Sequence, residues 1–227
     1  MVWTRSRATG VLAVGALVFA VPLGIIAGVT AAWRRNSSID RLITAIAATG
    51  ICTPPFFLGL ALVIVFSLYL GWTPASGMRS VGESSLTDLL RHLILPAVTL
   101  GSASAAAIAR MTRSSLLEVM AEDYVRTARA KGLSEAVVTW RHAFRNAMIS
   151  VITVVGLEAG YVVGGAVLVE VVFSWPGIGS LMMHGILRRD FTVVQACVLV
   201  VAASYVAINL IVDTLYTYID PRIRIAD

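Results

Sequence analysis

The segment that decides the fold covers residues 8–33 and reads ATGVLAVGALVFAVPLGIIAGVTAAW, 26 residues without a charged side chain. The hydrocarbon core of a bilayer takes roughly 20 helical residues, so this segment is long enough to cross a membrane as one helix. It is too long for the apolar region of a signal peptide, and no clear small-residue cleavage site follows it. We therefore predict a retained membrane span near the N-terminus.

Further apolar segments follow at residues 42–77, 93–109, 147–169 and 191–212. The chain of 227 residues is 58% hydrophobic and 14% charged, whereas charged residues supply about a quarter of a soluble domain. We predict an all-α integral membrane protein, a polytopic bundle of five transmembrane helices. Residues 1–227 then form a single transmembrane domain, which leaves too little chain for a sizeable soluble catalytic domain.

Lysine and arginine are distributed unequally between the two sides of this predicted bundle. Of the 18 basic residues, 12 fall after the first and third segments and at the C-terminus, and 6 fall on the other side. Cytoplasmic loops carry the excess of Lys and Arg, so we expect the N-terminus outside and the C-terminus inside. Topology thus accounts for the net charge of +5, and nucleic acid is not an expected partner.

The second and fourth segments contain residues that shape helices. Pro54 and Pro55 interrupt the long second segment and predict a kink, because proline leaves backbone carbonyls without a donor. In the fourth segment Gly156, Gly160 and Gly164 recur at every fourth position. This spacing predicts one smooth helix face, used either for close helix packing or for lining a cavity.

Three carboxylates lie within or at the edge of the apolar segments: Glu158, Glu170 and Asp213. Glu170 and Asp213 are near segment ends, where a side chain can reach water. Glu158 is deeper, and an ionisable group at membrane depth indicates a function or a specific partner. We consider a water-filled path, a helix–helix hydrogen bond and a proton relay as its alternatives.

Two connections on the predicted outer side combine tryptophan with turn-forming residues. The first covers residues 72–77, and the second contains Trp175, Pro176, Gly177 and Gly179. Tryptophan is enriched where a chain leaves the bilayer, so we expect both connections at the outer mouth. We also expect Ser180 to cap a short apolar helix over residues 181–187 that lies on this mouth.

The longest cytoplasmic connection, residues 110–146, has a pattern that membrane topology does not explain. Residues 123–135 read DYVRTARAKGLSE and predict a helix that Asp123 caps and Gly132 ends, followed by a second helix that Ser134 caps. Such a rigid elbow either lies on anionic lipid as a basic helix or docks a soluble partner. The sequence has no nucleotide-binding or hydrolytic motif and no metal-ligand spacing, so we expect no cofactor on this chain.

The elbow, followed by RHAFRNA at residues 141–147, resembles the cytoplasmic signature loop of binding-protein-dependent ABC importer permeases of the dipeptide/oligopeptide/nickel branch. Residues 164–179, GGAVLVEVVFSWPGIG, and the ending at residues 215–224 are similar to the same family. The resemblance extends over essentially the whole chain.

This resemblance implies a permease subunit, not an enzyme, in the bacterial inner membrane. Its cargo would be di- or oligopeptides, with nickel possible, and ATP and Mg would bind to partner subunits. The implied partners are a second homologous permease, two ATPase subunits or a fused pair, an extracytoplasmic substrate-binding protein and the lipid bilayer.

In this family the elbow helix sits in a cleft of the ATPase subunit and moves with it. The residues that the resemblance assigns to coupling are Asp123, Arg126, Thr127, Ala128, Arg129, Lys131 and Gly132. The segments that contain Pro54 and Gly156 would form part of the path, and Trp175 would lie near the binding protein.

The sequence departs from the family pattern in two ways. The general signature is Glu-Ala-Ala, three residues, then Gly, and Arg126 stands at the glutamate position, as is usual in this branch. Relatives usually have six spans, so we expect the first to be missing here, through a downstream start or a truncation. The alternative from another class is an ion-coupled secondary transporter or channel that uses Glu158 and Asp213 and needs no docking elbow.

Overall fold

The computed structural model describes residues 2–80, 82–83, 85–134 and 137–219, and within these ranges the chain is helical with no strand. The helices, two of them π-helical and labelled η, are α1 (Val2–Trp33), α2 (Ser38–Cys52), α3 (Pro55–Leu62), η1 (Val63–Tyr69), α4 (Leu86–Val119), α5 (Asp123–Ala130), η2 (Val138–Phe144), α7 (Arg145–Val172), α8 (Ile178–Leu187) and α9 (Phe191–Ile219).

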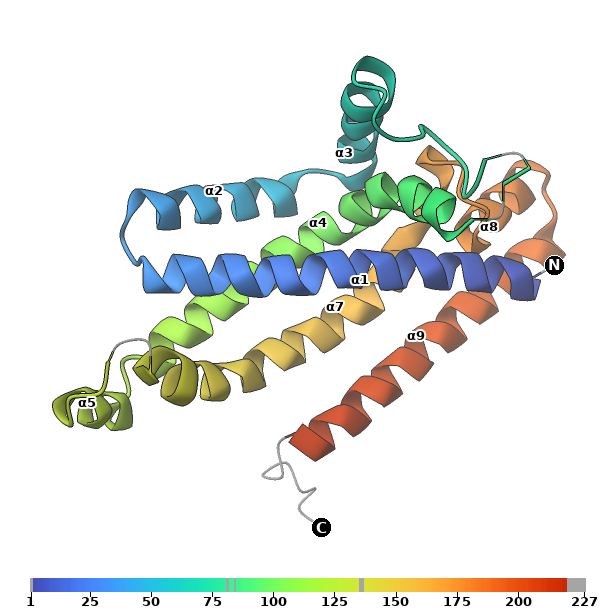
Figure 1. Cartoon of the computed structure of the whole chain (residues 1–227). Helices are drawn as coiled ribbons and strands as arrows, with labels where there is room; N and C mark the ends of the chain where they lie inside the picture. The colour runs from blue at the N-terminus through green and yellow to red at the C-terminus, as the bar shows by residue number, and fades with distance from the viewer. Residues whose placement is uncertain (1, 81, 84, 135–136, 220–227) are drawn as a thin grey trace, which may run out of the picture.

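The helices form an elongated bundle in which α4 packs on α1, α2 and α7, while α9 packs on α7 and α8 (Figure 1). Within the described residues, α1, α4, α7 and residues 191–212 of α9 are long and apolar enough to cross a membrane. The α2–α3–η1 segment adds a fifth span if its two bent parts are counted together. The prediction of an all-α membrane bundle is confirmed.

The second segment is a broken helix rather than a kinked one, which corrects the sequence prediction. The helix α2 ends at Cys52, and α3 starts at Pro55 after a bend of 107° (Figure 1). Pro54 is the cap of α3 and Pro55 its first residue, where proline's missing N–H costs nothing. The pair of prolines therefore starts a new helix.

The helix α4 is longer at both ends than residues 93–109, the apolar segment that predicted it. It runs over 34 residues and continues through residues 110–119, which we assigned to the cytoplasmic connection. The helix continues because Thr112, Ser115 and Leu116 are buried, with Leu116 in a cluster with Val29 of α1. The connection proper is therefore shorter than residues 110–146.

The backbones of α1 and α4 approach each other closely along their lengths. A Cβ atom at Gly28 would lie 2.5 Å from the carbonyl oxygen of Ala109, and one at Gly24 would lie 2.8 Å from that of Ala105. From the other helix, a Cβ atom at Gly101 would lie 2.6 Å from the carbonyl oxygen of Ala16. Small residues thus set the distance between the two central helices.

We predict that Gly28→Ala destabilises the bundle by about 2 kcal/mol, because the added methyl group overpacks the contact with α4. The matched control is Gly10→Ala in the same helix, where nothing lies within 4 Å of an added Cβ. Alanine has the higher helix propensity, so the control should keep or raise stability. Thermal unfolding of the chain in detergent micelles measures both, and equal midpoints would contradict the packing role of Gly28.

Candidate functional site

The elbow helix α5 begins at Asp123, one residue earlier than the predicted helix start. The N-cap is Glu122, without a side-chain cap bond, and Asp123 is the first helical residue, so its prediction as the cap is wrong. Asp123 still lies in the first turn, where a carboxylate interacts favourably with the helix dipole. Its backbone carbonyl accepts a hydrogen bond of 2.9 Å from the hydroxyl of Thr127.

The end of α5 is the glycine stop that the sequence predicts. Gly132 has a φ of +80°, in the left-handed region. Its N–H donates to the carbonyl of Arg129 at 2.9 Å, and the N–H of Leu133 donates to that of Ala128 at 3.4 Å. These two bonds form a Schellman motif, which satisfies the last carbonyls and turns the chain sharply.

The inner face of α5 is fixed to the rest of the protein. Val125 and Ala128 are buried in one cluster with Val138 of η2. The side-chain amide of Asn146 in α7 donates a hydrogen bond of 2.8 Å to the hydroxyl of Tyr124. The elbow is therefore attached to η2 and to the start of α7, so it can move with them as one unit.

The described part of the elbow's second helix begins at residue 137. The N–H of Val138 donates to the backbone carbonyl of Ser134 at 3.0 Å. Residues 135–136 lie outside the described residues. The capping of the second helix by the Ser134 side chain stays a prediction.

The outer face of α5 carries the exposed charged residues of the elbow. Arg126 is 75% exposed, and its ion pair with Asp123 at 3.5 Å lies fully at the surface, where such pairs contribute little stability. Thr127 and Lys131 are exposed as well, and Arg129 is half-buried. These residues share an accessible face at the end of the bundle opposite the N-terminus (Figure 1).

The predicted glycine face of α7 does not form one packed surface. Gly156 and Gly160 are buried, and an added Cβ at Gly160 would lie 2.9 Å from the ring of Tyr205 in α9. Gly164 is exposed, and nothing lies within 4 Å of an added Cβ, because this position faces away from the neighbouring helices. Burial thus covers Gly156 and Gly160, and a close contact with another helix is shown at Gly160.

Glu158 is half-buried on α7. It has no hydrogen bond or ion pair to another described residue, so the helix–helix hydrogen bond considered for it is not formed among these residues. The side chain of Asp213 lies outside the described residues, as does the ending at residues 220–224 that contributes to the resemblance.

Glu170 is the carboxylate that organises the opposite end of the bundle, and the expectation that it reaches water is wrong. The side chain is fully buried and accepts hydrogen bonds from the hydroxyl of Thr9 at 2.6 Å and from the N–H of Ser180 at 3.0 Å. The same Thr9 oxygen accepts the N–H of Ile178 at 2.9 Å. One carboxylate thus joins α1, α7 and α8.

Glycines leave room for the buried carboxylate in the region where α1, α7 and α8 meet, which we call the Glu170 corner. A Cβ atom at Gly177 would overlap the carboxylate of Glu170, and one at Gly179 would lie 2.5 Å from the Cα of Val167. Gly177 is also the N-cap of α8. Ser180 lies inside the first turn, so its prediction as the cap is wrong. The spacing from Glu170 to these glycines was the sequence signal for this site.

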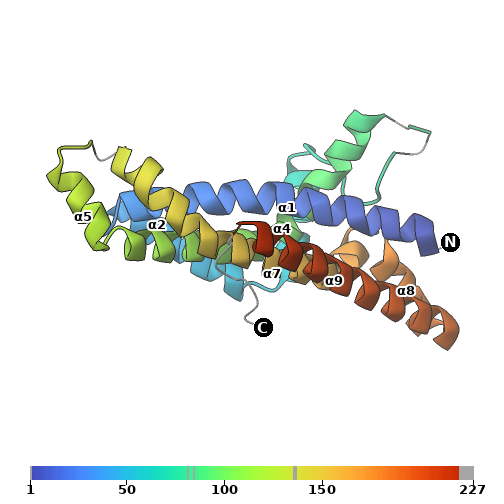
Figure 2. The same cartoon turned by 90° about the horizontal axis from the view of Figure 1, so that it is seen from below.

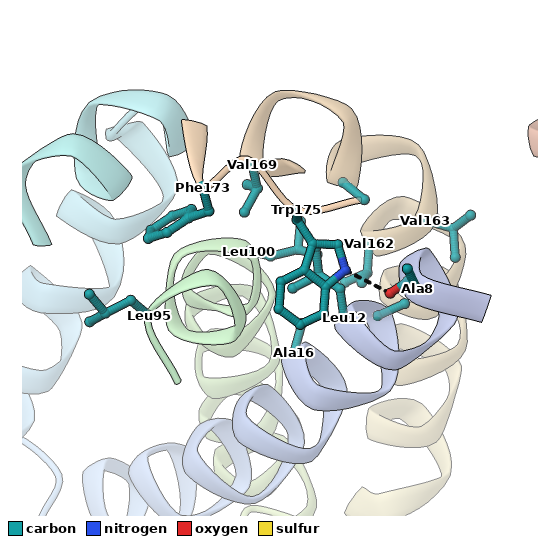
Figure 3. Close-up of a cluster of buried hydrophobic side chains, with 12 residues drawn as sticks. Ala8, Leu12, Ala16, Leu95, Leu100, Val162, Val163, Val169, Phe173 and Trp175 are labelled. Atoms are coloured by element: carbon teal, nitrogen blue, oxygen red, sulfur yellow. Dashed lines mark hydrogen bonds between the residues drawn. The ribbon is translucent and has the colours of Figure 1, made fainter. Parts of the chain in front are cut away.

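Trp175 lies in the core rather than at the membrane surface. Its side chain is fully buried, and its ring N–H donates a hydrogen bond of 2.8 Å to the carbonyl of Ala8 (Figure 3). The chain folds back after α7 through Ser174, whose φ is +50°, and this turn carries the ring inward against Leu12 and Val162. Of Trp175, Pro176, Gly177 and Gly179, only Pro176 is partly exposed, whereas Trp72 of the first connection is exposed as expected.

Residues 20–225 match the model of a protein family described as "Binding-protein-dependent transport system inner membrane component". The chain belongs to this family. It is a permease subunit of an ABC importer in the inner membrane, as the elbow resemblance predicts.

The relatives of this permease include two proteins named as peptide permeases. The di/tripeptide permease DppB of Pseudomonas aeruginosa is 47% identical over 97% of this chain and 71% of its own length. The dipeptide permease DppB of Alkalihalophilus pseudofirmus is 43% identical over 98% and 73%. The glutathione permease GsiC of Escherichia coli K12 is 47% identical over 94% and 67%.

Solved structures share the fold of the permease. An inward-facing conformation of the MetNI methionine ABC transporter aligns with a TM-score of 0.72 at 18% identity, over 96% of this chain and 94% of that chain. An amino acid ABC transporter aligns with a TM-score of 0.65 at 16% identity, over 97% and 92%. At these identities the likeness shows the common fold.

We predict that Glu170→Ala destabilises the permease by a few kcal/mol, because it leaves the buried donors Thr9 and Ser180 without an acceptor, at about 1–3 kcal/mol each. Glu170→Gln should have an intermediate effect, since its oxygen can still accept from Thr9 while its amide faces the N–H of Ser180. The control is Glu158→Ala on the same helix. If this control and Glu170→Ala unfold at the same temperature in detergent, Glu170 does not organise the corner.

Proposed function

We propose that this permease carries di- or oligopeptides across the inner membrane as part of an ATP-driven importer. The observation that carries the substrate class is the 47% identity to a di/tripeptide permease over 97% of the chain. The glutathione permease, at the same identity, also has a peptide-like substrate in its name. Nickel, the other cargo of the branch, has no such support among these relatives.

The proposed energy source is ATP, which with Mg binds to separate ATPase subunits, and α5 is their docking element. Support comes from the contacts of the elbow: its inner face is attached to η2 and α7, whereas its outer face presents Arg126, Thr127 and Lys131. Because α7 runs from the elbow to the Glu170 corner, a displacement of α5 can reach the other end of the bundle through a rigid helix. The permease would convert motion and catalyse no reaction.

The proposed orientation has the N-terminus outside and the elbow and C-terminus inside. The distribution of basic residues supports it. A substrate-binding protein would then meet the end near α8, and two ATPase subunits, or a fused pair, would meet the end near α5. A second homologous permease subunit would complete the path.

The direct test is uptake into proteoliposomes that hold the complete complex. We expect accumulation of labelled di- and oligopeptides with ATP and the binding protein present, and no accumulation of nickel. Accumulation of nickel but not of peptides would contradict the proposed cargo.

We predict that Gly132→Val uncouples transport while membrane insertion stays normal. An added Cβ has open space, so only the left-handed backbone opposes the substitution. The cost is about 1–2 kcal/mol, a factor of roughly 5–30 in population. Gly132→Asn, which tolerates this conformation, should keep most of the uptake.

The control for this experiment is Gly71→Val in the outer loop, where φ is +63° and the space is equally open. It imposes the same kind of strain far from α5 and should leave stimulation of the ATPase unchanged. Wild-type uptake and ATPase stimulation in Gly132→Val would overturn the docking role of the elbow.

We predict that Arg126→Glu weakens recovery of the ATPase subunit in pull-downs several-fold, because interface charges set orientation and specificity. Arg188→Glu is the control, since Arg188 is also exposed but follows α8 at the other end. If binding to anionic vesicles falls in Arg126→Glu while ATPase recovery is unchanged, the elbow is an interfacial basic helix.

We predict that Glu158→Gln lowers uptake only modestly and leaves it dependent on ATP, because a deep carboxylate without a polar partner in the described chain is poor evidence for a proton relay. The measurement is uptake by the variant complex with ATP and no ion gradient. Accumulation driven by a proton gradient alone, and lost in Glu158→Gln, would instead indicate an ion-coupled carrier.

A further inference from the structure

We use the name groove for the space between α1, α2 and α4, from the end near α5 toward the middle of the bundle. It consists of three adjoining cavities of about 610, 220 and 320 Å³. The first and second share Thr44 and Arg113, and the second and third share Ile43, Ala47 and Ala109. Figure 1 and Figure 2 both show α2 lying alongside α1 and α4 in this region.

The two ends of the groove differ in chemistry. The end near α5 is lined by Arg41, Arg113 and, in the second cavity, Arg110. The other end is lined by apolar and small side chains, including Ile46 and Gly50 of α2. The groove is therefore basic at one end and apolar along the rest of its length.

The arginines at the basic end have different partners. Arg113 is held by Asp40 through two hydrogen bonds of 2.6 and 2.8 Å, and Asp40 is buried. Arg41 and Arg110 are exposed, and neither has a carboxylate partner within the described residues. This end thus carries two positive charges that no described carboxylate compensates.

We propose that this groove binds an anionic phospholipid of the inner leaflet. The phosphate group would lie between Arg41 and Arg110, and an acyl chain would lie along α2 and α4 toward Gly50. Membrane topology explains why arginines lie on this side but not why they line the mouth of an apolar groove. An amphipathic anion matches both ends, whereas free phosphate would leave the apolar part empty.

The test compares lipids retained by the full chain purified from nanodiscs that contain equal amounts of phosphatidylglycerol and phosphatidylcholine. We expect preferential retention of phosphatidylglycerol, measured by native mass spectrometry. Arg41→Ala and Arg110→Ala should each lower this preference roughly five-fold, since a basic residue near the surface is worth about that factor. Arg34→Ala and Arg35→Ala, exposed at the same end but outside the groove, are the matched controls.

The position of the lipid is tested in the wild-type chain with a photoreactive group on the acyl chain of phosphatidylglycerol. We expect adducts on groove residues of α2 and α4, and we expect Gly50→Leu, which fills the apolar part, to remove them. Equal retention of both lipids, equal effects in the control variants, or adducts confined to α9 would overturn the proposal. Cross-linking of a second permease chain through Gly50→Cys would also overturn it, since the groove would then be a subunit interface.

Discussion

The arrangement of this permease depends on the close approach of α1 and α4. Lipid tails are as apolar as the helix faces, so burial of apolar surface does not drive these helices together inside a bilayer. Dispersion contacts do, and they need short distances. Gly24 and Gly28 of α1 meet the backbone of α4 directly, and Gly101 of α4 meets that of α1. The other helices are added to this pair.

Two buried carboxylates attach those helices at opposite ends of the pair. Near the elbow, Asp40 joins the start of α2 to Arg113 of α4. At the other end, Glu170 joins α7 to Thr9 of α1 and to the start of α8. Each carboxylate has several donors, which offsets the cost of its burial. Polar contacts fix the ends of the bundle, and small residues fix its middle.

Features with a local cause could be predicted from the sequence. The apolar segments indicate membrane helices by length alone, and Gly132 ends α5 because the stop needs only its own backbone conformation. The extra length of α4 was missed because residues 110–119 bury one face only, through contacts with α1. That partner is distant in the sequence, and so the apolar segment underestimated the helix.

The contacts between Glu170, Trp175 and α1 could not be predicted for the same reason. Trp175 bonds to Ala8, and Glu170 bonds to Thr9, across more than 160 positions of the chain. A tryptophan beside turn residues at a segment end is typical of a membrane surface. Only the return of the chain over α1 distinguishes a buried ring from an interfacial one.

The bend between α2 and α3 shows how tertiary contacts set a geometry that proline merely permits. The start of α2 is held at Arg113 of α4, whereas α3 crosses at Thr99 through Gly59, whose added Cβ would lie 3.2 Å from the Thr99 side chain. These two points are 14 residues apart, about 21 Å along α4, which is close to the length of the 15-residue α2. Because α2 runs along α4 over this distance, the chain has to turn before α3 can cross α4. The prolines supply a helix start at that point, and the contacts with α4 hold the two helices on either side of the bend.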